Sequence, residues 1–344
     1  MSPDPRPTRP FSLVRTLGKF GWFALQGHAL AWWLARHDAP FRQSYRGCRR
    51  EALAAAWRAD PTWADVVAAQ GRVTSRSLGL EFLGDDAVSR GYATWLALAP
   101  RGWTFRRTDG GLEAKRGELT LALETAEEEE MIREIYLDGC YDLRLPGRWQ
   151  VVDIGANVGM AALFFAGQPG VDRVVSFEPF GPTADAFARN VARNPALAAK
   201  IALRRVGLGE APGRLEVPYQ PDLRGSMSIA GVGDWRGTAA AAGQTVAIDV
   251  ERASAALAEI LAQPPAVRLL AKVDCEGSEY AILRDLASTG GLARFSAFVI
   301  EWHGRGPDEL TAMLQAAGFA LRVQPLSADP RALGLIYATR LPAS

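Results

Sequence analysis

The chain has 344 residues, of which 48% are hydrophobic and 22% charged, as expected for one large globular domain or two smaller ones. Its formal net charge of +1 argues against a nucleic-acid-binding protein, which usually carries a strong basic excess or a basic stripe. Cys48, Cys140 and Cys275 form no CxxC pair, which argues against a disulfide framework or a structural zinc site and favours a reducing, cytoplasmic location.

An apolar segment near the N-terminus, FGWFALQGHALAWWLA, covers residues 20–35. It is shorter than the roughly 20 residues that span a bilayer, and polar residues interrupt it at 26–28. No small-residue cleavage site follows, which disfavours a signal peptide. Two interpretations stay open: a buried helix, or an interfacial helix that makes peripheral membrane contact through Trp22, Trp32 and Trp33.

The chain divides by pattern into three regions. Residues 1–100 are predicted to be mostly helical, including a helix over DPTWADVVAAQG (60–71) with Asp60 as its N-cap and Pro61 at its first position. Residues 101–147 predict a small β-hairpin and a helix that lead into the core. Residues 148–344 form the predicted main domain.

The acidic run Glu127–Glu130 opens the helix predicted before residue 148. We interpret it as a solvated helix start, where carboxylates suit the positive end of the helix dipole, rather than as an acidic interaction site.

From residue 148 onward strands alternate with helices, which predicts an α/β fold with a doubly wound, mostly parallel sheet. The last two strands, at 320–326 and 333–340, follow one another without a helix. One of them is therefore predicted to be antiparallel.

The stretch VVDIGANVG ends the first strand of this domain and carries Asp153, Gly155, Asn157 and Gly159. Gly155 permits a sharp turn and a close approach to a ligand, and Gly159 lets the next helix pack close to the strand. Because position 157 is Asn, the dinucleotide pattern GxGxxG is incomplete. A carboxylate at Asp153 suits the cationic S-adenosylmethionine better than the pyrophosphate of NAD.

Glu178 ends the next strand, in VVSFEPF. An acid at this place can accept both hydroxyls of a ribose. Leu208 or Glu210 in VGLGE is expected near the nucleobase, and Ser226 and Ser228 in LRGSMSIAG either line the acceptor site or belong to a surface loop.

Four motifs together resemble the FkbM-type family of S-adenosylmethionine-dependent methyltransferases: VVDIGANVGM, FEPFGPTADAFARNVARN, AKVDCEGSEYAIL and FVIEWH. The resemblance covers about residues 120–340. It implies the Rossmann-like class I methyltransferase fold with a seven-stranded sheet, here with an N-terminal helical extension. It also implies O-methylation of a hydroxyl on a sugar or secondary metabolite. By motif, Asp153, Gly155, Asn157, Gly159 and Glu178 fall on cofactor positions.

The reacting side is expected at two neighbouring strand ends, one carrying Asp274 and the other Glu301 and His303. A small-molecule hydroxyl acceptor would lie between them. A neutral His303 is the predicted general base, Asp274 is a comparable base or positioning group, and a histidine that only bonds to the turn stays open.

No metal ligand set is assigned, although Mg²⁺ shared by Asp274, Glu276 and Glu301 is an alternative. Lys272 is expected to neutralise one of the acids. Two other functions remain open: an NAD-linked oxidoreductase and a non-catalytic nucleotide-binding module. No (D/N)PPY motif is present, so a nucleic-acid substrate is not expected, and no motif selects the acceptor or an oligomeric state.

Overall fold

The computed structural model describes residues 48–60, 64–84, 86–143, 146–228, 244–264 and 266–340. The chain splits into two compact units, Met1–Ala114 and Lys115–Ser344. The apolar segment 20–35 lies outside the described residues. Within the described ranges, no helix is both long enough and apolar enough to cross a bilayer.

The first unit mixes short helices and strands, and the boundary with the second unit falls within β4. Its elements in chain order are α4 (Arg50–Ala59), β1 (Val66–Ala69), β2 (Arg72–Ser75), α5 (Ala87–Arg90), α6 (Tyr92–Leu98), the 3-10 turn η1 (Ala99–Arg101), β3 (Thr104–Thr108) and β4 (Gly111–Arg116).

The helix predicted over 60–71 is wrong, because β1 and β2 form an antiparallel hairpin there. Gln70 and Gly71 both have positive φ, 53° and 78°, as a two-residue hairpin turn requires. The hairpin is held by the half-buried Asp65, whose carboxylate accepts hydrogen bonds from Ser77 Oγ at 2.5 Å and Tyr92 Oη at 2.7 Å. These contacts come from residues outside the helical pattern, so the pattern alone could not reveal them.

The second unit is built on a seven-stranded sheet in the order β14-β15-β13-β12-β6-β7-β8. Its strands are β6 (Trp149–Ile154), β7 (Val171–Phe177), β8 (Ile201–Arg204), β12 (Arg268–Val273), β13 (Ala297–His303), β14 (Ala320–Pro325) and β15 (Leu333–Thr339). All paired neighbours are parallel except β15, which runs antiparallel to β13 and to β14. The doubly wound sheet and its antiparallel strand are therefore confirmed.

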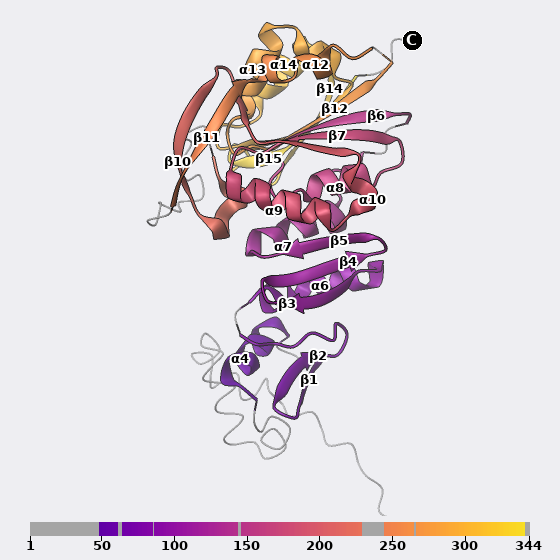
Figure 1. Ribbon diagram of the computed structural model, residues 1–344, viewed down its shortest axis with the longest axis vertical. Coiled ribbons are helices and arrows are strands. Elements are labelled where there is room, and N and C mark those ends of the chain that lie inside the picture. Colours follow the sequence, from indigo (N-terminus) through magenta and orange to yellow (C-terminus); the bar gives the residue numbers. More distant parts are fainter. Residues whose placement is uncertain are drawn as a thin grey trace, which may run out of the picture. The chain divides into compact units, whose positions relative to one another are not determined.

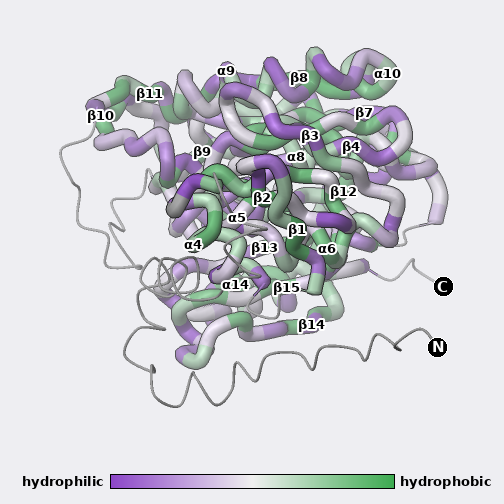
Figure 2. Tube along the Cα trace, turned by 90° about the horizontal axis from the view of Figure 1, so that it is seen from below, coloured by the Kyte–Doolittle hydropathy of each residue, from purple (hydrophilic) through white to green (hydrophobic). Residues whose placement is uncertain are grey.

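Helices cover both faces of this sheet (Figure 1). One face carries α8 (Met160–Ala166), α9 (Gly181–Ala192) and α10 (Pro195–Ala198), and the other carries α13 (Glu279–Ser288) and α14 (Asp308–Ala316). Every residue of β6 is buried, as expected for a central parallel strand covered on both faces. Hydrophobic and hydrophilic residues alternate along much of the described trace, as Figure 2 shows.

The remaining elements of this unit surround the sheet. They are β5 (Leu119–Leu123), α7 (Ala126–Arg133), the π-helical turn η2 (Glu134–Asp138), β9 (Gly207–Gly209), β10 (Gly213–Tyr219), the 3-10 segment η3 (Pro221–Ser226), β11 (Gln244–Arg252), α11 (Ala253–Ala256), α12 (Ala258–Leu261) and the 3-10 turn η4 (Gly291–Arg294). Strands β9, β10 and β11 form a small sheet in the order β10-β11-β9. β5 is held to the start of α10 by the N-cap residue Asn194, whose side chain bonds to both backbone groups of Thr120.

The end of β6 lies against the end of β12. The chain reverses at Gly155, whose φ is 76°, and a Cβ at this position would overlap the backbone oxygen of Asp274. Gly155 is therefore needed for the packing of two strand ends, in addition to any closeness to a ligand.

Replacing Gly155 with Ala should lower the free energy of unfolding by about 2–5 kcal/mol, because it adds both a backbone clash and an unfavourable φ. Denaturant unfolding measures the change. Gly181→Ala is the matched control, since a Cβ there meets no atom within 4 Å. Equal stability of the two variants would contradict this account of the turn.

Candidate functional site

A cavity opens at the carboxyl ends of β6, β7 and β12, where ligands bind in open α/β sheets. The cavity, together with the open solvent at its mouth, has about 550 Å³ of empty space. Its walls combine three strand ends with a loop beyond β10. The lining residues are Ile154, Gly155, Asn157, Phe177, Glu178, Pro179, Phe180, Val206, Gly207, Leu208, Arg224, Gly225, Met227, Asp274, Cys275, Glu276, Ser278 and Ile282.

The turn after β6 forms one wall. The amides of Gly155 and Ala156 donate to the carbonyl of Phe177 at 3.1 and 3.0 Å, which ties the turn to β7. Asn157 has a φ of 48°, a conformation that Asn tolerates better than most residues. Its Oδ1 is buried and has no hydrogen-bond partner among the described residues. An acceptor is thus held ready at the cavity wall.

Gly159 makes room for a helix, but not in the way expected. A Cβ at Gly159 would come within 2.9 Å of the Phe187 ring in α9, rather than against the strand. The close approach is therefore between the turn and α9, and Asn190 of α9 strengthens it by donating to the carbonyl of Val158 at 2.9 Å.

Glu178 lines the cavity but is already engaged with the backbone. Its two oxygens accept from the amides of Asn157 and Phe180, both at 2.9 Å. Burial raises the pKa of Glu178 to about 7, although both backbone hydrogen bonds oppose the shift. Each oxygen retains a further lone pair, which a hydroxyl can use.

Asp153 lies behind the turn rather than in the cavity wall. The residue is fully buried, its Oδ2 accepts from Ser176 Oγ at 3.1 Å, and its Oδ1 lies 3.4 Å from Lys272 Nζ. Burial raises the pKa of Asp153, although Lys272 opposes this shift. The expected match between Asp153 and a cationic ligand, directly or through water, stays a prediction, and the cation that the structure places beside Asp153 is Lys272.

Lys272 contacts both strand ends, whereas the sequence predicted only that it neutralises one acid at the ends of β12 and β13. Besides Asp153, its Nζ lies 3.4 Å from Asp274 Oδ2 and donates to the carbonyl of Gly155 at 2.5 Å. Burial alone would lower the pKa of Lys272, but the charges of Asp274 and Asp153 raise it, so the ammonium remains charged.

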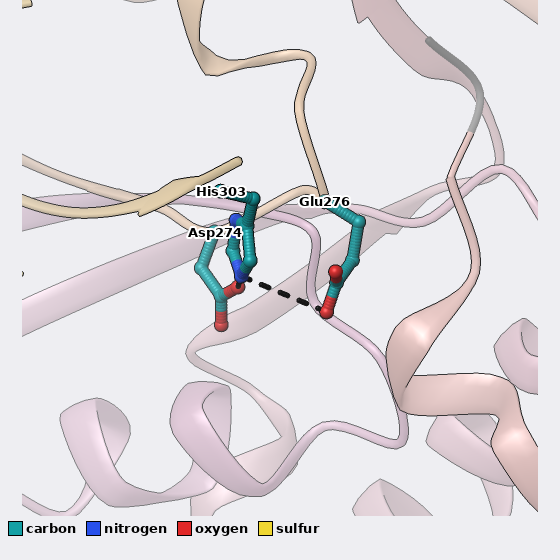
Figure 3. Close-up of side chains that lie close together, drawn as sticks. All are labelled: Asp274, Glu276 and His303. Atoms are coloured by element: carbon teal, nitrogen blue, oxygen red, sulfur yellow. Dashed lines mark ion pairs between the residues drawn. The ribbon is translucent and has the colours of Figure 1, made fainter. Parts of the chain in front are cut away.

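The strand ends predicted to carry the reacting side chains do lie side by side, since β12 and β13 are parallel neighbours. The side chains of Asp274, Glu276 and His303 converge there, as Figure 3 shows. His303 Nε2 lies 3.6 Å from Glu301 Oε1, 3.7 Å from Glu276 Oε1 and 4.0 Å from Asp274 Oδ1. Glu301, like Asp274, keeps part of its side chain exposed, at 19% and 27%.

The surroundings of His303 do not suit a neutral general base. The residue is only 1% exposed, does not line the cavity, and has its Nδ1 2.7 Å from Glu279 Oε1. Burial would lower the pKa of His303, but hydrogen bonds to Glu279 and Glu301 and the charge of Glu276 raise it well above its usual value. Asp274, which does line the cavity, is the better placed of the expected catalytic groups.

Several residues that support the cavity wall were not predicted from the sequence, above all those of the acidic run Glu127–Glu130. Glu127 and Glu128 are buried at 8% and 0% exposure, so the interpretation as a solvated helix start is wrong for them. Glu127 accepts from the amide of Gly225 and from Ser226 Oγ, both at 2.5 Å. Glu128 pairs with Arg224, whose Nε donates at 2.7 Å. The first turn of α7 thus holds η3, which forms part of the cavity wall.

Of the remaining residues that the sequence predicted near the ligand, some line the cavity and others do not. Leu208 lines it, whereas Glu210 pairs with Arg284 away from it. Ser228 Oγ donates to the carbonyl of Glu276 at 2.5 Å, which supports the turn after β12.

Two residues of the segment before β6 lie near the acidic strand ends without any motif to mark them. Tyr141 Oη donates to Asp274 Oδ2 at 3.4 Å. Partial burial and the charges of Glu301 and Asp274 raise the pKa of Glu134 to about 8. No motif in the sequence marks Glu134 or Tyr141, because the distance of each from the acidic strand ends is set by how the chain folds between α7 and β6.

Replacing Lys272 with Met should lower the free energy of unfolding by about 3–5 kcal/mol, because Asp153 and Asp274 lose a buried cationic partner. The loss should be smaller at pH 5 than at pH 8, since Asp153 then has a raised pKa and protonation removes its unpaired charge. Denaturant unfolding at the two pH values measures both effects.

The double variant Lys272→Met with Asp153→Asn should recover part of this loss, because the uncompensated charge is removed. Arg214→Met is the control, since Arg214 and Asp249 form an exposed pair with 70% and 65% of their side chains exposed, worth about 0–1 kcal/mol. Equal losses at Lys272 and Arg214 would refute the structural importance of Lys272.

Comparison with known proteins finds methyltransferases among the relatives of this chain. Residues 153–321 match the methyltransferase FkbM domain family. Methyltransferase sdnD of Sordaria araneosa is 29% identical over 240 residues, which cover 64% of this chain and 92% of that protein. Methyltransferase 1 of Beauveria bassiana is 29% identical over 213 residues, which cover 58% of this chain and 83% of that protein. The solved methyltransferase FkbM of Methylobacillus flagellatus aligns with 73% of this chain and 59% of its own at 18% identity and a TM-score of 0.39.

The matched range begins at Asp153 and contains the turn after β6, Glu178 and the acidic ends of β12 and β13. The four motifs that suggested the family therefore lie within or next to the range that matches it. With the seven-stranded sheet and two curated methyltransferases among the relatives of this chain, residues 153–321 form a methyltransferase domain of the FkbM family.

Proposed function

We propose that this methyltransferase uses S-adenosylmethionine to methylate a hydroxyl group of a small molecule, such as a sugar or a secondary metabolite. The observation that carries the proposal is a single cavity with two chemically different ends. One end offers acceptor atoms on the turns after β6 and β7, and the other offers the carboxylates of Asp274 and Glu276.

The residues of the first end suit the donor. The buried acceptor Asn157 Oδ1 fits the ammonium of its amino-acid part, and Glu178 retains lone pairs for ribose hydroxyls. Phe180 and Leu208 supply apolar surface for the nucleobase. When bound, the donor supplies an activated methyl group on a sulfonium that is already a good leaving group.

Since the leaving group needs little help, the protein contributes mainly orientation and removal of the hydroxyl proton. Asp274 lines the cavity, and its Oδ1 and Oδ2 face His303 and Lys272 respectively. A hydroxyl at this rim can donate to the Asp274 carboxylate, which accepts the proton. Glu301 lies at the end of the neighbouring strand β13, behind the residues that line the cavity.

Binding of S-adenosylhomocysteine tests the cofactor and the role of Glu178. Isothermal titration should give heat with this nucleoside and none with NAD. Because the pKa of Glu178 lies near 7, the affinity should fall up to about tenfold from pH 8 to pH 6, as the carboxylate that accepts the hydroxyls becomes protonated.

Glu178→Gln should weaken binding and abolish this pH dependence, whereas Glu216→Gln, at an exposed position of β10, should change neither. Heat with NAD but not with S-adenosylhomocysteine would favour an NAD-linked oxidoreductase and overturn the proposal.

Methyl transfer itself can be measured with a radiolabelled donor and a panel of sugar and metabolite hydroxyls. With an acceptor in hand, Asp274→Asn should lower the rate by about 10²- to 10⁴-fold while nucleoside binding persists, as expected for loss of a general base. Asp249→Asn on β11 is the exposed control. Unchanged turnover by Asp274→Asn would reject this role, and binding without transfer to any acceptor would favour a non-catalytic module.

A further inference from the structure

The ends of β12 and β13 bring several acidic side chains close to one imidazole ring. Four carboxylates, those of Asp274, Glu276, Glu279 and Glu301, lie within 4.0 Å of the ring nitrogens of His303. The nearby cation Lys272 is shared between Asp153 and Asp274. Carboxylate oxygens and an imidazole nitrogen gathered in a largely buried place are the kinds of ligands that divalent metal ions take.

The orientation of His303 is set by Glu279. Glu279 is fully buried, and its Oε1 lies 2.7 Å from His303 Nδ1 and accepts from the amide of Cys275 at 3.2 Å. With Nδ1 held in this way, Nε2 faces Asp274, Glu276 and Glu301. A carboxylate that fixes one imidazole nitrogen while the other points at oxygen ligands is the usual second layer of a metal site.

A separate observation is an unsatisfied atom in the same cluster. Glu279 Oε2 is buried and has no hydrogen-bond partner within the part of the chain that the structure describes. A fully buried carboxylate with one unsatisfied oxygen is expensive when its surroundings are already negative. A cation bound to the adjacent imidazole would lower that cost.

The spacing of the ligand atoms is close to that around one ion. One ligand atom each from Asp274, Glu276 and His303 lie within 4.8 Å of one another (Figure 3). Around an octahedral ion with bonds of about 2.1 Å, adjacent ligand atoms are about 3 Å apart and opposite ones about 4.2 Å. Small side-chain rotations are sufficient to bring the three atoms onto one ion.

We propose that Asp274, Glu276 and His303 bind a divalent transition-metal ion of the Mn²⁺ type, with Glu301 at the open side and Glu279 orienting His303. The imidazole is the reason for this choice, because Mg²⁺ and Ca²⁺ prefer oxygen ligands alone. The site is formed by protein side chains only, so the proposal does not depend on the methyl donor or on the acceptor.

The test uses the full chain after treatment with a chelator and dialysis. Mn²⁺ is titrated in, and the free ion is followed by electron paramagnetic resonance. We expect about one bound Mn²⁺ per chain, with Mg²⁺ competing only at a large excess. Nucleoside binding, measured separately, reports on the proposed function, so a failure of either proposal can be told from a failure of the other.

Glu276→Gln and His303→Gln should each weaken Mn²⁺ binding at least tenfold, whereas Glu309→Gln, which removes a partly exposed acid paired with Arg284, should leave it unchanged. Far-ultraviolet circular dichroism checks the folding of each variant. Absence of bound Mn²⁺ in the unaltered chain, or equal binding by Glu276→Gln and Glu309→Gln, would overturn the proposal. The first result does not depend on whether any variant folds.

Discussion

The contact of the Lys272 ammonium with two strand ends is the interaction on which the site depends. Lys272 lies between Asp153 on β6 and Asp274 after β12, and it also donates to the carbonyl of Gly155. The same two strand ends are in backbone contact, since Gly155 has no room for a Cβ beside Asp274. The ion pairs of Lys272 and the close backbone packing at Gly155 therefore both hold the two strand ends together, and the cavity lies beside this contact.

The cavity wall opposite the glycine turn depends on long-range polar contacts. The first turn of α7 binds η3 through buried carboxylates, and these join residues about a hundred positions apart in the chain. Ser228 continues the wall by bonding to the turn after β12. A loop rich in small residues has little apolar surface of its own to bury, so fixed hydrogen bonds to buried acids are what hold it in place.

The acidic rim changes how its histidine is understood. A histidine at a strand end beside a proposed hydroxyl acceptor suggests a proton acceptor, but His303 is enclosed by carboxylates and is not part of the cavity wall. Its neighbours favour a positive charge at the ring. Asp274 then becomes the group that touches the acceptor, while His303 acts within the cluster behind it. The role of each side chain at the rim thus depends on whether that side chain lines the cavity.

The sequence by itself determined the α/β alternation, the antiparallel final strand, the family and the strand ends that carry Asp153, Glu178, Asp274 and His303, because these depend on local periodicity and on motifs continuous in the chain. It misread residues 60–71 and the buried acids of α7, where distant partners outweigh local pattern. Only the tertiary structure decided that Asp153 faces Lys272 instead of the cavity and that His303 lies among four carboxylates. A side chain's charge state and direction depend on neighbours brought together by folding, and no spacing along one strand contains that information.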